Sequence, residues 1–469
     1  MRRDKARRVV ARLLDTVPRV SDTQSESVQT PRSGARTVAG AIVIFSDDHP
    51  VFAPTALVEN VPVRWGKGDV GGVNVDDGRM SQAHLEVRFA AGLFHLEDLG
   101  SRNGTTVDGK PLSRGAVPPG AVVRMGRTLV LLVADLAPYA QHVELVHEAL
   151  GAGPKQPFVI GPLYRAVLER IASARARGSH LVILGETGCG KEYAAHHFHR
   201  AAARPGPFTA VNAREINASL GDVTGTAANI ATGVKERAGL VELSSGGVLF
   251  FDEFAEMSAE VQAQLLRIVQ SGEVRRAGAA QPTRVDVQYL CASHQSMSDR
   301  VASGEFREDL FDRLRQVEVR VPPLRERKEE IPWLLDLDAR AEGMTVHSSA
   351  VEAVLLRPWR GNLRDLRRAT REAIGEARAA GKTQLREAHF SFVEPGAGAT
   401  APEPQRPTTS TPPTPRKDYS RDELLDALTQ HAWNISRTAT ALDLWREQLK
   451  RLMRKHGLEK PGGGEGDDE

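Results

Sequence analysis

Short apolar runs separated by turn residues dominate residues 40–135. The runs AIVIF, HLEVRF, LFHLEDL and TLVLLVA are divided by Gly, Asp, Asn and Pro. Runs of this length with such boundaries are typical of antiparallel strands. We therefore expect an all-β sandwich over 40–135.

Residues 156–393 combine buried-strand runs with helical stretches. The apolar run LVIL precedes a Gly-rich loop and the helix-compatible AAHHFHRAA, and VLFF forms a second strand-like run. Strands that alternate with helices predict an α/β domain with a parallel sheet. Further along, leucines recur at helical spacing within 418–459, at Leu424, Leu425 and Leu428, which predicts a small all-α domain.

Four segments lack such patterns and are predicted to be linkers or tails. They are the basic and polar residues 1–39, the stretch 136–155, the Pro/Thr-rich stretch 394–417 and the tail 460–469. At 469 residues, with 41% hydrophobic and 26% charged residues, the chain is typical of soluble multidomain proteins. No signal peptide, membrane span or disulfide framework is indicated, so we expect a cytoplasmic protein without a membrane partner.

The string GETGCGKE fits the phosphate-binding P-loop. Its glycines allow backbone amides to surround phosphates, and its lysine neutralises their charge. Here Glu192 replaces the usual Ser or Thr that binds Mg²⁺. The predicted nucleotide-binding residues are Gly185, Glu186, Thr187, Gly188, Cys189, Gly190, Lys191 and Glu192.

Two carboxylates follow the run VLFF and lie, by prediction, beside the P-loop. We expect Asp252 to hold Mg²⁺ through water and Glu253 to position or deprotonate the attacking water. The alternative is a solvated acidic turn after a core strand. The cofactors predicted from these residues are ATP and Mg²⁺.

The string SQAHLEVRF…LEDLGSRNG in the first block resembles a forkhead-associated domain, a family that binds phosphothreonine peptides. The resemblance implies that Ser81 and Arg102 contact the phosphate, that Asn103 holds the peptide backbone, and that His84 braces the loop. Lys67 stands where the family usually has Arg, and Lys offers a point charge instead of a two-pronged donor. The alternative is a tight turn beside a core histidine.

The second block resembles the AAA+ domain of sigma-54-dependent activators, in which GKE is the usual end of the P-loop. FTAVNA, GGVLFFDE, FREDLFDRL, VPPLRERKEEI and WRGNLRDLRRA match as well. The resemblance implies an α/β part over 156–335 and an α-helical lid over 336–393. It makes Asn212 a switch residue for Glu253, Arg307 and Arg313 arginine fingers in a hexameric ring, and Arg364 a nucleotide contact. Local ion pairs of the two finger arginines remain the alternative.

Two positions depart from this family. The region SLGDVTGTAANIATGVKERAGL has neither the order GAFTGA nor its Phe, which touches sigma-54 in the family. His294 stands in YLCASH where the family has an Asn that senses nucleotide. An imidazole also forms hydrogen bonds, so His294 is a predicted nucleotide-binding residue.

The third block resembles a Fis-type helix-turn-helix over 418–459. The resemblance places a recognition helix in the major groove of DNA, and a small helical hairpin with a basic face is the alternative. The predicted DNA-binding residues are Arg446, Glu447, Gln448, Lys450 and Arg451.

These parts together predict an ATP-dependent bacterial transcription regulator. Its expected partners are upstream DNA, a phosphothreonine protein from a Ser/Thr kinase pathway, further copies of itself and, as a candidate, the sigma-54 RNA polymerase. Two alternatives remain open. The ATPase could serve only as an assembly switch, or the chain could be a phosphopeptide-binding scaffold with a weak ATPase.

Overall fold

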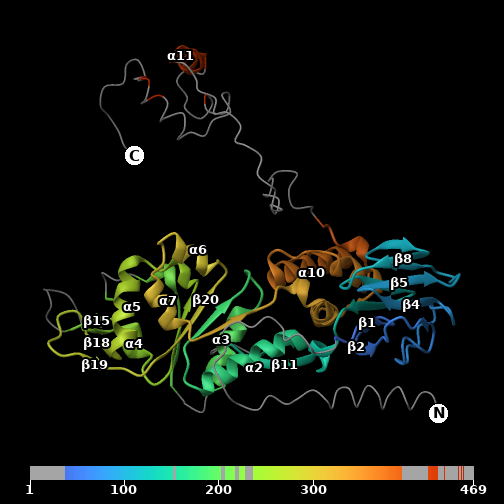
Figure 1. Ribbon diagram of the computed structural model, residues 1–469, viewed down its shortest axis with the longest axis horizontal. Coiled ribbons are helices and arrows are strands. Elements are labelled where there is room, and N and C mark those ends of the chain that lie inside the picture. Colours follow the sequence, from blue (N-terminus) through green and yellow to red (C-terminus); the bar gives the residue numbers. More distant parts are fainter. Residues whose placement is uncertain are drawn as a thin grey trace. The chain divides into compact units, whose positions relative to one another are not determined.

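The computed structural model describes residues 37–150, 155–201, 206–216, 221–227, 236–392 and 421–430, with the single positions Thr438, Met453, His456 and Leu458. The chain forms two compact units, Met1–Val393 and Glu394–Glu469. Figure 1 shows the helices and strands of both units, which are described separately here.

The first unit begins with a β-sandwich, as the short apolar runs between turn residues predict. One sheet has the order β2-β1-β10-β9-β6-β7 and the other has the order β3-β4-β5-β8. Trp65, Phe94 and Leu96 fill the space between the two sheets. The strands are β1 (Gly40–Ser46), β2 (His49–Ala56), β3 (Val63–Trp65), β4 (Leu85–Ala90), β5 (Leu93–Asp98), β6 (Thr105–Val107), β7 (Lys110–Leu112), β8 (Arg114–Val117), β9 (Val122–Met125) and β10 (Thr128–Val133).

The two central strands β1 and β10 are buried on both faces. Val130 and Leu132 of β10 pack inside the sandwich. Leu129, Leu131 and Val133, which point to the opposite face, join a second core with the helices of residues 331–379. Side chains alternate along a strand, so the continuous apolar run TLVLLV supplies two different cores.

A five-stranded parallel sheet forms the centre of the α/β part. Its order is β14-β17-β20-β13-β21, so the carboxyl ends of these strands meet at one edge. The strands are β13 (Leu181–Leu184), β14 (Phe208–Asn212), β17 (Val248–Asp252), β20 (Gln288–Ser293) and β21 (Val317–Arg320). The helices are α2 (Pro162–Ala176), α3 (Lys191–Arg200), α4 (Leu240–Leu243), α5 (Ala259–Ser271), α6 (Met297–Ala302) and α7 (Glu308–Leu314).

A helical lid follows the sheet and covers the outer face of the sandwich. It contains α8 (Ile331–Ala341), α9 (Ser348–Leu355), α10 (Asn362–Ala379) and the short strands β22 (Thr345–Val346) and β23 (Gln384–Leu385). Helix α9 contacts β1, β9 and β10. Its Glu352 accepts hydrogen bonds from Thr106 Oγ1 at 2.7 Å and from Arg124 Nε at 2.6 Å. Polar and apolar contacts thus join the lid to the sandwich.

The structure also shows how the chain passes between these parts. The predicted linker 136–155 contains β11 (Glu144–Ala149), which pairs with β12 (Lys155–Ile160). The lid helix α8 starts at Ile331, before the predicted boundary at 335/336, because Pro332 suits a first helical turn and no breaker follows until Gly343. The remaining strands form the pairs β15 (Gly225–Thr226) with β16 (Arg237–Ala238) and β18 (Glu273–Val274) with β19 (Thr283–Arg284).

In the second unit the structure describes helix α11 (Arg421–Gln430), where Leu424 and Leu428 are buried. The predicted recognition-helix residues Arg446, Glu447, Gln448, Lys450 and Arg451 lie outside the described residues. Within the described parts of the chain, every helix is too short or too polar to span a membrane.

Candidate functional site: a nucleotide pocket and a phosphopeptide loop cluster

The P-loop connects β13 to α3 in a backbone conformation that requires glycine. Gly188 and Gly190 have φ angles of 73° and 109°, which side chains disfavour. A Cβ atom on Gly188 would lie 2.3 Å from the carbonyl oxygen of Gly361. The loop therefore lies directly against the lid.

Lys191 begins α3, after β13 and the P-loop, and Asp252 ends β17 at the same edge of the sheet. Lys191 is almost fully buried and donates from Nζ to the carbonyl oxygens of Gly185 at 2.9 Å and Glu186 at 3.3 Å. Burial raises the pKa of the Asp252 carboxyl, and the neighbouring Glu253 raises it further, whereas Lys191 lowers it. A partly desolvated carboxylate next to a lysine suits a ligand with both phosphate and a cation.

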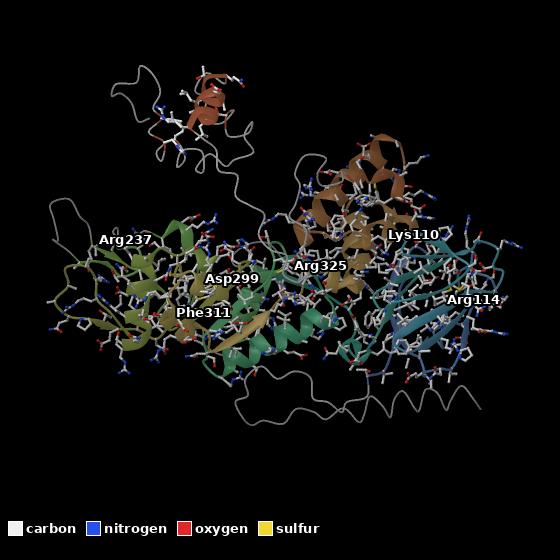
Figure 2. The ribbon with its side chains drawn as sticks, turned by 45° about the horizontal axis from the view of Figure 1, so that its top comes forward. Lys110, Arg114, Arg237, Asp299, Phe311 and Arg325 are labelled. Atoms are coloured by element: carbon white, nitrogen blue, oxygen red, sulfur yellow. The ribbon has the colours of Figure 1, made fainter. Side chains whose placement is uncertain are left out.

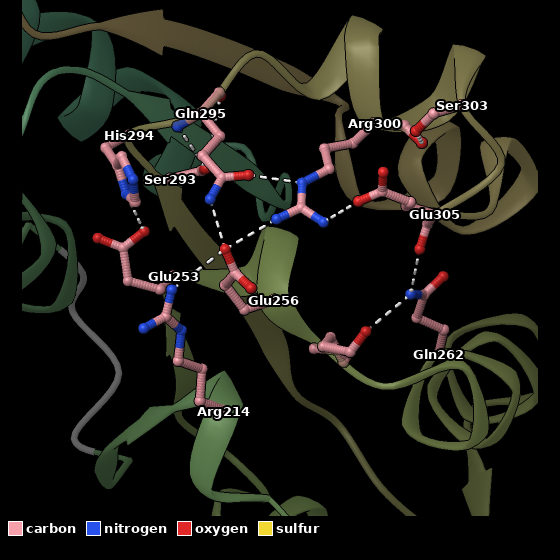
Figure 3. Close-up of polar contacts among 11 residues, drawn as sticks. Arg214, Glu253, Glu256, Gln262, Ser293, His294, Gln295, Arg300, Ser303 and Glu305 are labelled. Atoms are coloured by element: carbon pink, nitrogen blue, oxygen red, sulfur yellow. Dashed lines mark hydrogen bonds and ion pairs between the residues drawn. The ribbon is translucent and has the colours of Figure 1, made fainter. Parts of the chain in front are cut away.

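Glu253 has a left-handed backbone conformation, and its carboxylate lies against His294. Its φ of 51° is in the left-handed region, and its amide donates to Asp252 Oδ1 at 3.0 Å. Figure 3 shows His294 and Glu253 pointing toward each other, with Nδ1 and Oε2 separated by 2.5 Å. Asn212, the predicted switch residue, instead accepts a hydrogen bond from the amide of Arg214 at 3.1 Å.

A pocket of about 430 Å³ lies between the P-loop, β17 and the lid. Its lining combines apolar side chains, which suit a planar base, with ionic groups, which suit phosphates. The apolar lining residues are Leu150, Phe158, Val159, Tyr164, Leu334 and Leu363, and the ionic ones include Lys191, Glu192, Asp252, Glu253, Arg364, Arg367 and Arg371. His294 does not line this pocket, although sequence reasoning placed it at the nucleotide.

Three residues outside the P-loop, Arg325, Asn362 and Arg327, hold it in place but were not predicted as site residues from the sequence. Glu186 accepts two hydrogen bonds of 2.7 Å from Arg325, which Figure 2 labels. Asn362 is fully buried and donates to Glu186 Oε2 at 3.1 Å and to the Thr187 carbonyl at 3.0 Å. Arg327 donates to the Cys189 carbonyl at 2.8 Å. The strings PPLRERKEE and WRGN, already matched to the family, contain these residues.

The two predicted arginine fingers lie on or beside α7, away from the pocket lining. Arg307 pairs with Asp309 through bonds of 3.0 and 2.7 Å, as the local ion-pair alternative describes. Its backbone amide donates to Gln262 Oε1 at 2.9 Å. Arg313 is exposed. Both guanidinium groups are accessible enough to meet a neighbouring chain.

The loops at one end of the sandwich bring the predicted phosphopeptide residues together. Ser81 Oγ accepts a hydrogen bond from the Arg102 amide at 3.1 Å, and Asn103 Nδ2 donates to the Arg79 carbonyl at 2.6 Å. His84 is fully buried, accepts from the Ser81 amide at 3.1 Å and lies 3.2 Å from the Gly104 carbonyl. His84 thus braces both loops.

Asp98, which sequence reasoning missed, organises the same loop. Its carboxylate accepts hydrogen bonds from Thr105 Oγ1 at 2.6 Å and from the amide and hydroxyl of Ser101 at 2.7 Å. Burial raises the pKa of Asp98, but these hydrogen bonds outweigh burial and leave it lowered. Lys67 lies nearby with its Nζ 3.6 Å from Asp76. The signal was an Asp shortly before the turn residues Gly100 and Ser101, because Asp side chains often accept hydrogen bonds from nearby turn amides.

The donor set of the pocket fits a magnesium ion that is bound together with phosphates. Among the described residues, no group of three or more His, Cys, Asp or Glu could hold a metal alone. Mg²⁺ commonly takes one or two carboxylates and completes its shell with phosphate oxygens and water. Asp252 beside the P-loop provides such a carboxylate.

The fold and pocket define a P-loop AAA+ domain with a lid, joined to a forkhead-associated sandwich. Residues 161–320 match the sigma-54 interaction domain, and residues 63–126 match the FHA domain. The chain belongs to the family of sigma-54-dependent transcription regulators.

Individual relatives support this assignment. The chain is 30% identical over 405 residues to the anaerobic nitric oxide reductase transcription regulator NorR of Aeromonas hydrophila. This alignment covers 80% of this chain and 79% of NorR. It is 35% identical over 316 residues to the acetoin catabolism regulatory protein of Cupriavidus necator, covering 64% and 47%. The chain spans about half the length of several curated relatives that it matches.

A solved structure with a similar chain is NtrX from Brucella abortus in complex with ATP. It is 27% identical, has a TM-score of 0.44, and the similarity covers 66% of this chain and 70% of that chain.

Proposed function

We propose that this protein is an ATP-dependent transcription regulator that binds a phosphothreonine protein and DNA. The observation that carries the proposal is one pocket lined by Lys191, Asp252, Glu253 and Arg364. These groups provide a phosphate cation, a metal ligand, a carboxylate for the attacking water and a guanidinium from the lid. The relatives named above are themselves regulators.

The residues have distinct roles in this proposal. The amides of Gly188 and Gly190 and the side chain of Lys191 hold the phosphates, and Arg364 closes the lid over them. Asp252 would hold Mg²⁺, which neutralises phosphate charge when bound. Glu253 positions water for attack, and Asn212 at the neighbouring strand end would influence Glu253. The apolar lining residues would hold the base.

Ring assembly would complete the site. Arg307, directly before α7, and Arg313, on α7, are exposed, and guanidinium groups supplied in trans accelerate phosphoryl transfer by about 10³–10⁵. A head-to-tail contact repeated around a closed rotation gives the expected hexamer. The C-terminal unit would hold this ring at upstream DNA.

Phosphothreonine recognition would use Ser81, Arg102 and Asn103, with Lys67 in support. Charge-assisted hydrogen bonds from a guanidinium and an ammonium favour a phosphate dianion. We expect an Arg102→Ala variant to lose most of its affinity for a phosphothreonine peptide. Fluorescence anisotropy with the phosphorylated and unphosphorylated peptides measures this loss.

A Lys191→Ala variant tests the ATPase. It should lose ATP binding in calorimetry yet bind upstream DNA as the wild type does. Arg237→Ala, in the α/β part but away from the pocket lining, is the matched control. Normal ATP hydrolysis by Lys191→Ala would show that the site is wrongly assigned.

The output of the ATPase has a second candidate. The segment between β15 and β16 lacks the GAFTGA order, which favours a nucleotide-dependent assembly switch that does not touch sigma-54. Open-complex formation with purified sigma-54 polymerase separates the two. A chain that hydrolyses ATP and assembles on DNA without opening the promoter would support the switch. Absence of turnover, with or without phosphopeptide, would support the scaffold alternative.

A further inference from the structure

We propose that His294 is a positioning residue that orients the carboxylate of Glu253. This inference rests on the proposed ATPase. It gives His294 a role that acts through Glu253, in place of the direct nucleotide contact expected from the sequence. It begins from the hydrogen bond of 2.5 Å between His294 Nδ1 and Glu253 Oε2. Because an ionised carboxylate only accepts hydrogen bonds, the proton of this bond lies on Nδ1.

The residues that flank Glu253 in the sequence fix its backbone but not its carboxylate. Asp252 precedes it as the last residue of β17, and Phe254 after it is fully buried. Glu256, three residues on, binds Arg300 at 2.8 Å and Arg214 at 3.2 Å (Figure 3). These anchors hold Glu253 in its left-handed conformation, a strain that is common at functional sites. The direction of the side chain still requires a separate contact.

His294 provides that contact. Among the described residues, it is the sole hydrogen-bonding partner of the Glu253 carboxylate, and it uses one oxygen, Oε2. The other oxygen, Oε1, has no partner in the described parts of the chain and stays available to water. Carboxylates that accept a charge-assisted hydrogen bond on one oxygen are held in one rotamer, as a water-positioning group requires.

The pocket geometry separates this role from direct nucleotide contact. Glu253 lines the pocket, whereas His294 does not. His294 follows β20, the strand that pairs with β17, so it approaches Glu253 from the side of the sheet. It therefore acts through Glu253. Asn212 is engaged with the Arg214 amide, so the two side chains have different partners in this state.

Kinetics of five variants test the proposal: His294→Ala, His294→Asn, Glu253→Gln, the double variant and a control. We expect His294→Ala to lower kcat for ATP about 10-fold, the factor for losing one hydrogen bond to a charged group, with KM and ATP affinity unchanged. His294→Asn, which restores an N–H donor, should recover most of the loss. In a Glu253→Gln background, His294→Ala should cause little further loss, because the two residues act as a unit. His95→Ala on the sandwich is the control.

Each other outcome contradicts the proposal. Equal losses in ATP affinity and kcat for His294→Ala would show direct nucleotide contact. Unchanged kcat, or no recovery with Asn, would also refute positioning. A wild-type protein that binds but never hydrolyses ATP would refute the proposed ATPase and the catalytic role together. Histidine NMR still decides then whether the pair exists: the His294 Nδ1 proton signal should vanish in Glu253→Ala, which removes the acceptor.

Discussion

The substitution Leu131→Ala should weaken the packing between the lid and the sandwich, because this side chain faces the lid. Leu131 is 3% exposed and belongs to the core shared with Leu334 and Val351 of the lid. Its neighbour Leu132 is fully buried inside the sandwich. Leu→Ala at either position should lower the free energy of unfolding by about 2–5 kcal/mol, since each removes buried methyl groups and leaves a cavity.

The two variants should differ in where the structure loosens. Leu131→Ala should speed amide hydrogen exchange in α8 and α9, whereas Leu132→Ala should speed it in β4 and β5, the strands across the sandwich. Exchange is followed by mass spectrometry on the full chain, and unfolding by denaturant titration. If Leu131→Ala leaves α8 and α9 protected while it destabilises β4 and β5, the two-faced packing of β10 is wrong.

Three further changes follow from the same contacts. Glu352→Gln removes the charge that Arg124 meets, and since Arg124 is 32% exposed we expect a loss near 1 kcal/mol in denaturant unfolding; no loss would mean the pair contributes nothing. Burial raises the pKa of the Glu329 carboxyl from 4.5 to about 8. As the pH rises between these values the unfolded chain loses the proton first, so the free energy of unfolding falls. Glu329→Gln should flatten this part of a plot of Tm against pH, and an unchanged plot would contradict the argument. Gly188→Ala should weaken ATP binding at least ~10-fold because its Cβ would strike the Gly361 carbonyl, and calorimetry with normal affinity would refute this.

The sequence predicted the fold well where local patterns and motifs coincide. The sandwich, the P-loop between a strand and a helix, and the carboxylates at the end of a buried strand are all present. These features depend on contacts within about thirty residues or on strand ends that a parallel sheet must bring together. Hence Lys191, Asp252 and Glu253 could be placed beside each other before the structure was known.

Partners chosen by tertiary packing could not be predicted in this way. Asn362 reaches the P-loop from a lid helix 176 positions later in the chain. Glu352 meets Arg124 across 228 positions. A residue of each kind is common on solvated surfaces, and no local spacing marks these as buried contacts.

One signal for the lid contact was nevertheless present in the sequence. The runs AIVIF and TLVLLV are apolar at successive positions, although a solvated sandwich strand should alternate. Their outward residues, Ile42, Ile44, Leu129 and Leu131, are the ones that pack with the lid. An antiparallel strand without polar alternation therefore indicates a covering partner. In this chain that partner also carries Arg364, which lines the pocket, so the sandwich and the pocket belong to one compact unit.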